Sequence, residues 1–239
     1  GQGGLFTAED LRAAVKPRGH MLYPATTLVE IENTHNRAGG VVFPQDEAER
    51  ICAAARERGI ATYLDGARLW NTAVATRRAP AELAAPFDLV SVALSKGLGA
   101  PGLSVLAGTG PLIAAALRQR RMLGGAMRQI GIFCAAGLYA IEHNLERLTE
   151  DHEHARLVAR RLAGSPRFVV DADAVRTNIL VFGLADGAPD APTVVARAQE
   201  RGVLLFAFGP RTIRLVTHLD VSRSQCERAA EVLLEVAES

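Results

Sequence analysis

The chain has 239 residues, of which 49% are hydrophobic and 22% charged, as is typical of a globular protein with one large or two smaller domains. A net charge of +1 gives no global basic field of the kind that attracts nucleic acid. Because no apolar run reaches the length of a membrane span, we expect neither a membrane nor a nucleic-acid partner.

Three cysteines form an odd, widely spaced set in helix-like segments: Cys52, Cys134 and Cys226. This pattern does not resemble a disulfide framework, so we expect buried free thiols in a reducing compartment. The predicted location is therefore the cytoplasm.

The first half of the chain alternates helix and strand patterns, beginning with a helix that Thr7 caps and that has an acidic first turn at Asp10. The expected elements are, in order, helix 9–15, strand 27–32, helix 46–58, strand 60–64, helix 68–75, strand 87–94, strand 103–107 and helix 111–121. The run at 87–94 is almost continuously apolar, as expected of a strand covered on both faces. This alternation predicts an α/β layered sheet.

The second half begins with a helical block and then changes composition. A single helix over 127–148 is apolar on much of its circumference, so we expect it to be largely buried. A further helix follows at 151–162. The remaining expected elements are strands at 168–170, 178–182, 204–206 and 212–216, with helices at 191–201 and 222–237. We therefore predict a large domain over 1–150 and a small α+β domain over 151–239.

Two charged residues, Asp65 and Lys96, fall at the carboxyl ends of neighbouring apolar strands, where open α/β sheets bind ligands. A partly desolvated lysine suits imine chemistry. An aspartate can pair with a protonated pyridine nitrogen, as in proteins that bind pyridoxal 5'-phosphate (PLP). On spacing alone an alternative remains open, in which Asp65 caps the following helix and Lys96 is a solvated loop residue.

Two further segments match the residue pattern of a binding motif but lack the structural context that the motif requires. The segment 97–102 fits G-x-G-x-x-G, but a strand-like run follows it instead of a helix, and the acidic residue expected about twenty positions on is absent. The run Asp151-His152-Glu153-His154 suggests a metal cluster, yet residues two apart on a helix point to different faces. We therefore predict a solvated, charged helix face at 151–154 and no metal site.

Arg214 lies inside the apolar strand pattern IRLV, where a bare cation would be costly. Its partner is either a substrate carboxylate, held bidentately, or an internal Asp or Glu, and both remain open. His35 follows a strand in a polar turn and either acts on a substrate hydroxyl or hydrogen-bonds within that turn. For His218, beside Asp220, we predict a structural role.

Five collinear segments, IENTHNRAGG, LDGARLWN, SVALSKGLGAP, RRMLGGAMRQIG and IRLVTHLDVS, resemble the motifs of threonine aldolases. The resemblance runs from about residue 28 to the C-terminus. It is to the low-specificity L-threonine aldolase type, in the β-eliminating lyase family of the aspartate-aminotransferase-like PLP superfamily. It implies a PLP-dependent transferase-like (fold type I) sheet with flanking helices, and a small α+β C-terminal domain. It also implies a homo-oligomer, a dimer or a tetramer.

The activity that the resemblance implies is a carbon–carbon lyase reaction, which cleaves L-threonine, L-allo-threonine and similar β-hydroxy-α-amino acids to glycine and an aldehyde. The residues that it assigns to the cofactor are Lys96 as the covalent anchor, Asp65 at the pyridine nitrogen, Ser95 near the phosphate, and Arg68 at the phenolic oxygen or the substrate. Arg214 would fix the substrate carboxylate. His35, or a water that it positions, would remove the proton of the β-hydroxyl group.

The chain also departs from the family pattern. Leu103 stands where threonine aldolases usually have glycine, and Arg121 where several relatives have lysine. Relative to that family an N-terminal segment is absent, and in the family it holds the phosphate loop and the histidine that stacks on the pyridine ring. Two alternatives follow. One is a catalytically silent aldolase-like domain that acts only as an assembly partner, and the other is a β-eliminating lyase for another amino acid.

Overall fold

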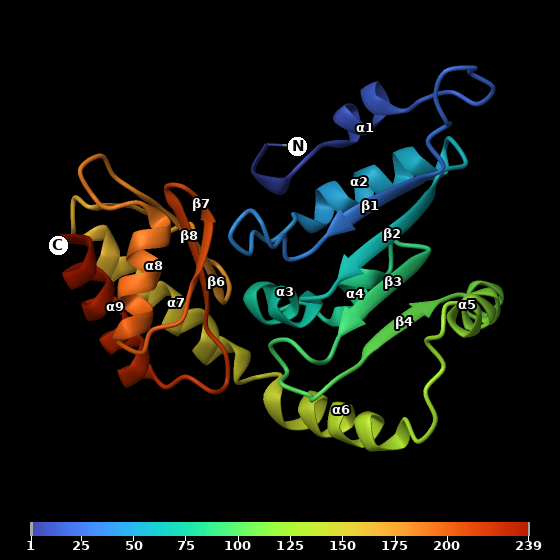
Figure 1. The fold of residues 1–239 in the computed structure, drawn as a ribbon. Helices are drawn as coiled ribbons and strands as arrows, with labels where there is room; N and C mark the ends of the chain where they lie inside the picture. The colour runs from blue at the N-terminus through green and yellow to red at the C-terminus, as the bar shows by residue number, and fades with distance from the viewer. Residues whose placement is uncertain (1, 239) are drawn as a thin grey trace. The chain divides into compact units, whose positions relative to one another are not determined.

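The computed structural model describes residues 2–238, which form two compact units (Figure 1). The first unit comprises Gly1–Thr34 and Val42–Leu145, and the second comprises His35–Val41 and Glu146–Ser239. The segment 35–41, part of the predicted 1–150 domain, thus packs with the second unit. After this segment the chain returns to the first unit, and it passes to the second unit again between Leu145 and Glu146.

The first unit is built on a four-stranded sheet in the order β1-β2-β3-β4. Its strands are β1 (Leu28–Glu32), β2 (Ala61–Gly66), β3 (Leu89–Ala93) and β4 (Ser104–Gly108). Strands β1, β2 and β3 are parallel, and β4 is antiparallel to β3. The helical elements are η1 (Gln2–Gly4), α1 (Ala8–Ala14), α2 (Gln45–Arg56), α3 (Leu69–Thr76), α4 (Pro80–Ala84), α5 (Gly110–Met122) and α6 (Gly131–Asn144).

The first helices and strands form where the local sequence signals predict them. Thr7 and Asp10 make a reciprocal capping box at the start of α1, which satisfies backbone donors that have no partner within the helix. One face of the sheet buries Ile31, Leu64 and Val90 against helices that include α2. Two short elements were not expected, η1 and α4. The segment of α4 is rich in alanine and proline and carries no apolar period.

The prediction that the run 87–94 is covered on both faces is wrong for the described residues. Val90 is buried, whereas Ser91 and Ala93, which alternate with it, are only half-buried. Strand β4 is exposed along its whole length. The polar Ser91 within the run was the local sign that one face of this strand is not part of the core.

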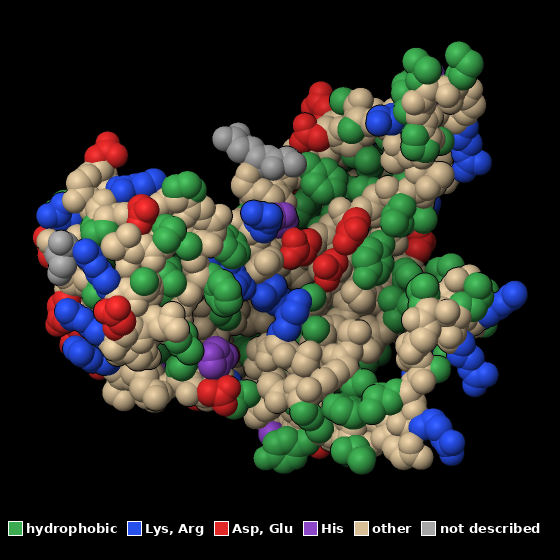
Figure 2. All heavy atoms as spheres, in the orientation of Figure 1, with side chains coloured by type: hydrophobic (Ala, Val, Ile, Leu, Met, Phe, Trp, Pro, Cys, Tyr) green, Lys and Arg blue, Asp and Glu red, His purple; other side chains and the backbone are tan. Residues whose placement is uncertain are grey.

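The expected long buried helix over 127–148 is also wrong in extent and in burial. Helix α6 ends at Asn144, and its buried residues are Gly137 and Ala140. Ile132, Leu138 and Tyr139 are exposed, at 75%, 61% and 61% of their surface. Figure 2 shows apolar side chains on the surface over this helix. The helix is apolar on all sides, but only the face that contains Gly137 and Ala140 packs against the rest of the unit.

The second unit has an antiparallel sheet in the order β5-β6-β8-β7, covered by three helices, in agreement with the expected α+β arrangement. The strands are β5 (Phe168–Val169), β6 (Ile179–Leu184), β7 (Phe206–Gly209) and β8 (Thr212–Val216). The helices are α7 (Leu148–Ala163), α8 (Ala191–Glu200) and α9 (Arg223–Glu238). Phe182, Ile213 and Leu233 are fully buried at the centre of its core.

The cysteine prediction holds for two of the three thiols. Cys52 and Cys226 are buried, whereas Cys134 is exposed because it lies on an uncovered side of α6. No helix within residues 2–238 combines the length and the apolar character that crossing a membrane requires.

Candidate active site

Asp65 lies on β2, one residue before its carboxyl end, and is half-buried. Its Oδ1 atom accepts a hydrogen bond from the backbone N–H of Ala67 at 3.0 Å, which forms a local turn. The N-cap of α3 is Arg68, so Asp65 does not cap that helix. Within residues 2–238 the Asp65 side chain makes no other hydrogen bond or ion pair, and its second oxygen therefore remains available to a ligand.

The neighbouring strands bring polar groups beside Asp65. Glu32 of β1 and Ser91 of β3 are its register partners, so the three side chains lie on the same face of the sheet. Tyr63 donates a hydrogen bond to Ser91 Oγ at 2.7 Å. Trp70 Nε1 donates to the carbonyl oxygen of Ala93 at 3.0 Å, which ties α3 to the end of β3.

Lys96 and Ser95 are exposed in the turn that follows β3. The turn closes on itself, because the backbone N–H of Gly99 donates to the carbonyl oxygen of Lys96 at 2.9 Å. Since β2 and β3 are adjacent and parallel, Asp65 and Lys96 leave the sheet at the same edge. The structure therefore has Asp65 and Lys96 at the ends of two neighbouring parallel strands, as the strand pattern in the sequence predicts.

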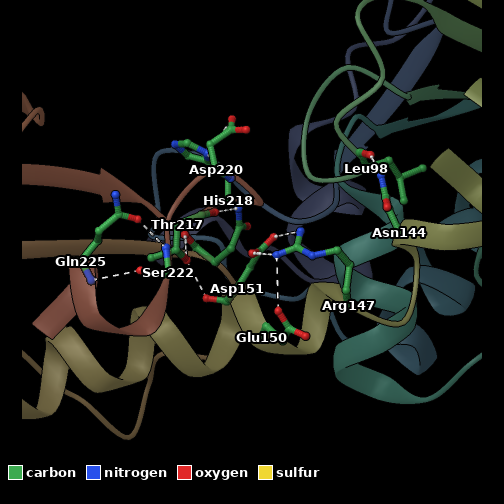
Figure 3. Close-up of polar contacts among 11 residues, drawn as sticks. Leu98, Asn144, Arg147, Glu150, Asp151, Thr217, His218, Asp220, Ser222 and Gln225 are labelled. Atoms are coloured by element: carbon green, nitrogen blue, oxygen red, sulfur yellow. Dashed lines mark hydrogen bonds and ion pairs between the residues drawn. The ribbon is translucent and has the colours of Figure 1, made fainter. Parts of the chain in front are cut away.

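Helix α6 holds the lysine turn in place. Asn144 Nδ2 donates a hydrogen bond to the carbonyl oxygen of Leu98 at 2.8 Å (Figure 3). A methyl group on Gly137 would come within 2.7 Å of Leu94 Cδ1, so this glycine permits the close approach of the helix. Sequence reasoning did not identify Asn144, because nothing in the helix pattern marks its partner.

The departure at Leu103 has a structural consequence. Its φ angle is 88°, in the left-handed region that glycine adopts without steric cost. Leucine meets a clash between its Cβ and the backbone there, so the turn after Lys96 carries local strain.

Arg214 lies on β8 in the second unit, half-buried. Its Nε atom is buried without a hydrogen-bond partner, and its guanidinium carbon lies 5.4 Å from the centre of the Phe208 ring. Among residues 2–238 it has no ion-pair partner, so the internal salt bridge left open by the sequence is not formed. Burial lowers the pKa of Arg214, as expected of a cation without a neighbouring anion.

His35 belongs to the second unit, and its Nδ1 atom accepts a hydrogen bond from the backbone N–H of Ala38 at 3.2 Å. The neutral ring therefore carries its proton on Nε2, which is a donor in this state. This bond is the turn contact considered from the sequence. For His218, the Nδ1 atom accepts from the backbone N–H of Asp220 at 3.3 Å, which fits the expected structural role.

The segment 151–154 corrects the prediction of a solvated helix face. Asp151 and His152, at the start of α7, are 0% and 2% exposed. Arg147 Nη2 donates to Asp151 Oδ1 at 2.8 Å, and Thr217 Oγ1 donates to the backbone carbonyl of Asp151 (Figure 3). Burial raises the pKa of Asp151, while Arg147 opposes that shift. These contacts join α7 to Thr217, which directly follows β8 and is three residues from Arg214.

The groups in the first unit fit PLP chemically. Asp65 offers a carboxylate oxygen that has no partner among the described residues to a protonated ring nitrogen, and Lys96 offers an amine to an aldehyde. Both come from adjacent strand ends of a parallel sheet. No cluster of three or more histidine, cysteine, aspartate or glutamate side chains suited to a metal ion occurs within residues 2–238.

The sheet with its strand-end groups places the chain among α/β proteins of the PLP-dependent transferase-like fold. A threonine aldolase from Leishmania major has the same fold, with a TM-score of 0.73 and 19% identity over 97% of this chain and 67% of that protein. A PLP-dependent aminotransferase from Streptococcus suis matches with a TM-score of 0.73 and 20% identity, over 98% and 61% of the two chains. These similarities confirm the predicted fold class.

Residues 1–185 match the sequence profile of the family described as beta-eliminating lyase, and the chain belongs to this family. It is 37% identical over 225 residues to low-specificity L-threonine aldolase 1 of Arabidopsis thaliana. That match covers 93% of this chain and 63% of the plant protein. The chain thus spans less than two thirds of the length of this relative.

Proposed function

We propose that the chain acts in a PLP-dependent aldolase that cleaves β-hydroxy-α-amino acids of the L-threonine and L-allo-threonine type to glycine and an aldehyde. The observation that carries this proposal is the pair of Asp65 and Lys96 at adjacent strand ends, with one carboxylate oxygen of Asp65 left to a ligand. Family membership and the similarity to an enzyme named as an L-threonine aldolase support it.

Four residues would hold the cofactor. Lys96 supplies the amine for covalent attachment, and the Asp65 carboxylate keeps a proton on the pyridine nitrogen. Arg68 contacts the phenolic oxygen or the substrate, and Ser95 helps to bind the phosphate. The chemistry that PLP supplies when bound is an electron sink for the pair left on Cα as the Cα–Cβ bond breaks.

Two residues would orient the substrate. Arg214 binds the carboxylate through its guanidinium group, which has no anionic partner among the described residues, and thereby fixes which bond to Cα is cleaved. His35 presents a proton on Nε2 when neutral, so it donates a hydrogen bond to the β-hydroxyl group or to a water. In this proposal the proton of the hydroxyl group leaves through that water, which His35 positions, to bulk solvent.

The direct test uses the fact that the chain contains two lysines, Lys16 and Lys96. The purified chain is titrated with PLP, and its visible absorbance is recorded before and after borohydride reduction. We expect a visible band from bound PLP, and we expect reduction to attach the cofactor irreversibly to the chain. Peptide mass mapping should locate this modification at Lys96. Lys96→Ala should lose the band, while Lys16→Ala, the matched control, should keep it.

Cleavage is tested separately, by the release of acetaldehyde from L-threonine. A band that survives in Lys96→Ala would show that another group binds the cofactor, and the assignment would be wrong. A fixed band at Lys96 without acetaldehyde release would favour the catalytically silent alternative. Release of ammonia and a keto acid from another β-substituted amino acid would favour the β-eliminating alternative.

We further propose that the protein is a homo-oligomer in the cytoplasm. The exposed apolar residues of α6, among them Ile132 and Leu138, support contact with a second copy, and the three free thiols support a reducing compartment. Light scattering coupled to gel filtration tests the first point, because a mass of 25.4 kDa at all concentrations would contradict an oligomer of this chain.

A further inference from the structure

Two arginines of the second unit share one aromatic ring. The guanidinium carbon of Arg37 lies 5.9 Å, and that of Arg214 5.4 Å, from the centre of the Phe208 ring. Within residues 2–238 neither side chain makes a hydrogen bond or an ion pair. Both cations therefore lie within 5.9 Å of the centre of one ring, without an anion from the described protein. Arg37 is exposed to solvent, so the lack of an anion is costly mainly at Arg214, whose Nε atom is buried.

A bulge in β7 brings the ring to this position. Ala207 pairs with Ile213 and Gly209 pairs with Thr212, so Phe208 is the extra residue between the two pairs. Ile213 points into the core and is 0% exposed, whereas Arg214, the next residue of β8, lies on the other face. Bulges commonly redirect a side chain beside a functional site, and here the ring is directed to the face of Arg214.

The segment that carries Arg37 is fixed to the same sheet. Thr177 Oγ1 donates a hydrogen bond to the carbonyl oxygen of Gly40 at 2.7 Å. A methyl group on Gly39 would contact Val181, which is the register partner of Arg214 on β6. Arg37 is therefore held near Arg214 by buried contacts of its own segment.

We propose that Arg37 and Arg214, oriented by Phe208, form a two-cation site for a ligand with two anionic groups, such as an amino acid with a second carboxylate on its side chain. This inference rests on the proposed carboxylate role of Arg214. One guanidinium group binds one carboxylate in a bidentate manner, so the second cation selects ligands that bring a second anion. Contact with the ring limits the freedom of both arginines before a ligand binds.

The test measures binding at Arg214 directly, by nuclear magnetic resonance of the ¹⁵N-labelled 239-residue chain. The buried Nε–H group of Arg214 should give a resonance that is assigned by its loss in Arg214→Lys. Acetate and malonate, which carry one and two carboxylates at neutral pH, are titrated at constant ionic strength. Arg37→Gln removes the second charge and Arg37→Lys retains it. Arg176→Gln is the matched control, since Arg176 is exposed and contacts neither ring nor anion.

We expect Arg37→Gln to weaken malonate binding by about fivefold, as for a charge pair that is partly exposed to solvent, and to change acetate binding by less than about twofold. Arg37→Lys should restore most of the malonate affinity, and Arg176→Gln should change neither ligand. Equal malonate affinity in the wild type and Arg37→Gln would overturn the two-cation site. If acetate does not move the Arg214 resonance at all, the carboxylate role of Arg214 fails first, and the inference fails with it.

Discussion

Leu103 occupies a backbone conformation that usually selects glycine, with a φ of 88° beside the lysine turn. We expect Leu103→Gly to be more stable than Leu103→Ala by about 1 kcal/mol, because both remove the side chain but only glycine removes the Cβ clash. At ordinary positions the order is the reverse, since glycine loses more backbone entropy on folding. Urea unfolding of the two variants measures the difference, and a more stable alanine variant would contradict the strain.

His152 makes the stability of the second unit depend on pH. Burial lowers its pKa from 6.5 in the unfolded chain to about 4 in the folded protein. The unfolded chain therefore binds the proton first, so the contribution of His152 is complete above pH 6.5 and is lost as the pH falls towards 4. The loss amounts to as much as about 3 kcal/mol.

Urea unfolding at several values between pH 7 and pH 4 checks this sign. His152→Gln should have a shallower loss of stability than the wild type over the same range, while His20→Gln, which changes an exposed histidine, should follow the wild type. The comparison also separates His152 from Asp151, whose raised pKa acts in the opposite direction. Identical slopes in all three proteins would mean that His152 titrates normally in the folded state.

Among the elements, β2 and β3 depend on a close approach at Gly66, the residue after Asp65. A methyl group there would lie 2.7 Å from the carbonyl oxygen of Ser91, which is backbone and cannot rotate away. We expect Gly66→Ala to destabilise the protein by about 1–3 kcal/mol, as overpacking commonly does.

The matched control for this change is Gly131→Ala at the start of α6, where an added methyl group meets nothing within 4 Å. The control should be neutral or stabilising, because alanine favours a helix by up to about 1 kcal/mol over glycine. The midpoints of thermal unfolding for the two variants give the comparison. A neutral Gly66→Ala would show that the two strands tolerate separation at this point.

The elements also show which sequence signals are sufficient. Capping at Thr7, alternation in the strands and apolar runs gave nearly every helix and strand, because these signals are local. The burial of α6 could not be predicted, since the sequence of a helix that is apolar on all sides does not indicate which face packs against a neighbour. The bulge at Phe208 could not be predicted either, because the pairing register depends on the partner strand and not on the sequence of β7 alone.

For the whole molecule, the two buried thiols report on the two units separately, since Cys52 lies in the first and Cys226 in the second. We expect Cys52 to become reactive at a lower urea concentration than Cys226. The first unit contains α5, which has no buried residue, and an apolar helix that is mostly exposed, whereas the helices of the second unit all contribute to its core.

Thiol labelling followed by peptide mass mapping measures both transitions in one experiment. Cys134 should react at once in the native protein, and Cys134→Ser removes this signal as a control. Burial also raises the pKa of Cys52 to about 11, which suppresses its thiolate in the native state. Simultaneous labelling of Cys52 and Cys226 would instead mean that the two units unfold as one.

For the candidate site, the positions that depend on local sequence could be predicted, whereas the contacts with residues far along the chain could not. The strand-end positions of Asp65 and Lys96 followed from the sequence, because each is fixed by its own strand. The sequence did not show that Arg214 lacks an ion-pair partner among residues 2–238, since any of the chain's acidic residues could have reached it through the fold. The burial of Asp151 was missed for the same reason, because Thr217, which contacts its backbone carbonyl, lies 66 residues further along the chain, directly after β8.

The second unit is discontinuous in the sequence, because the segment 35–41 joins it from far upstream. The bond between Thr177 and Gly40 closes a loop of 137 residues, and the entropy cost of closure grows with loop length. During synthesis the segment leaves the ribosome long before the strand that receives it, and it remains without these partners until most of the chain has followed. The joining of the early segment 35–41 to the region of Thr177 is therefore expected to come late in the folding of this unit.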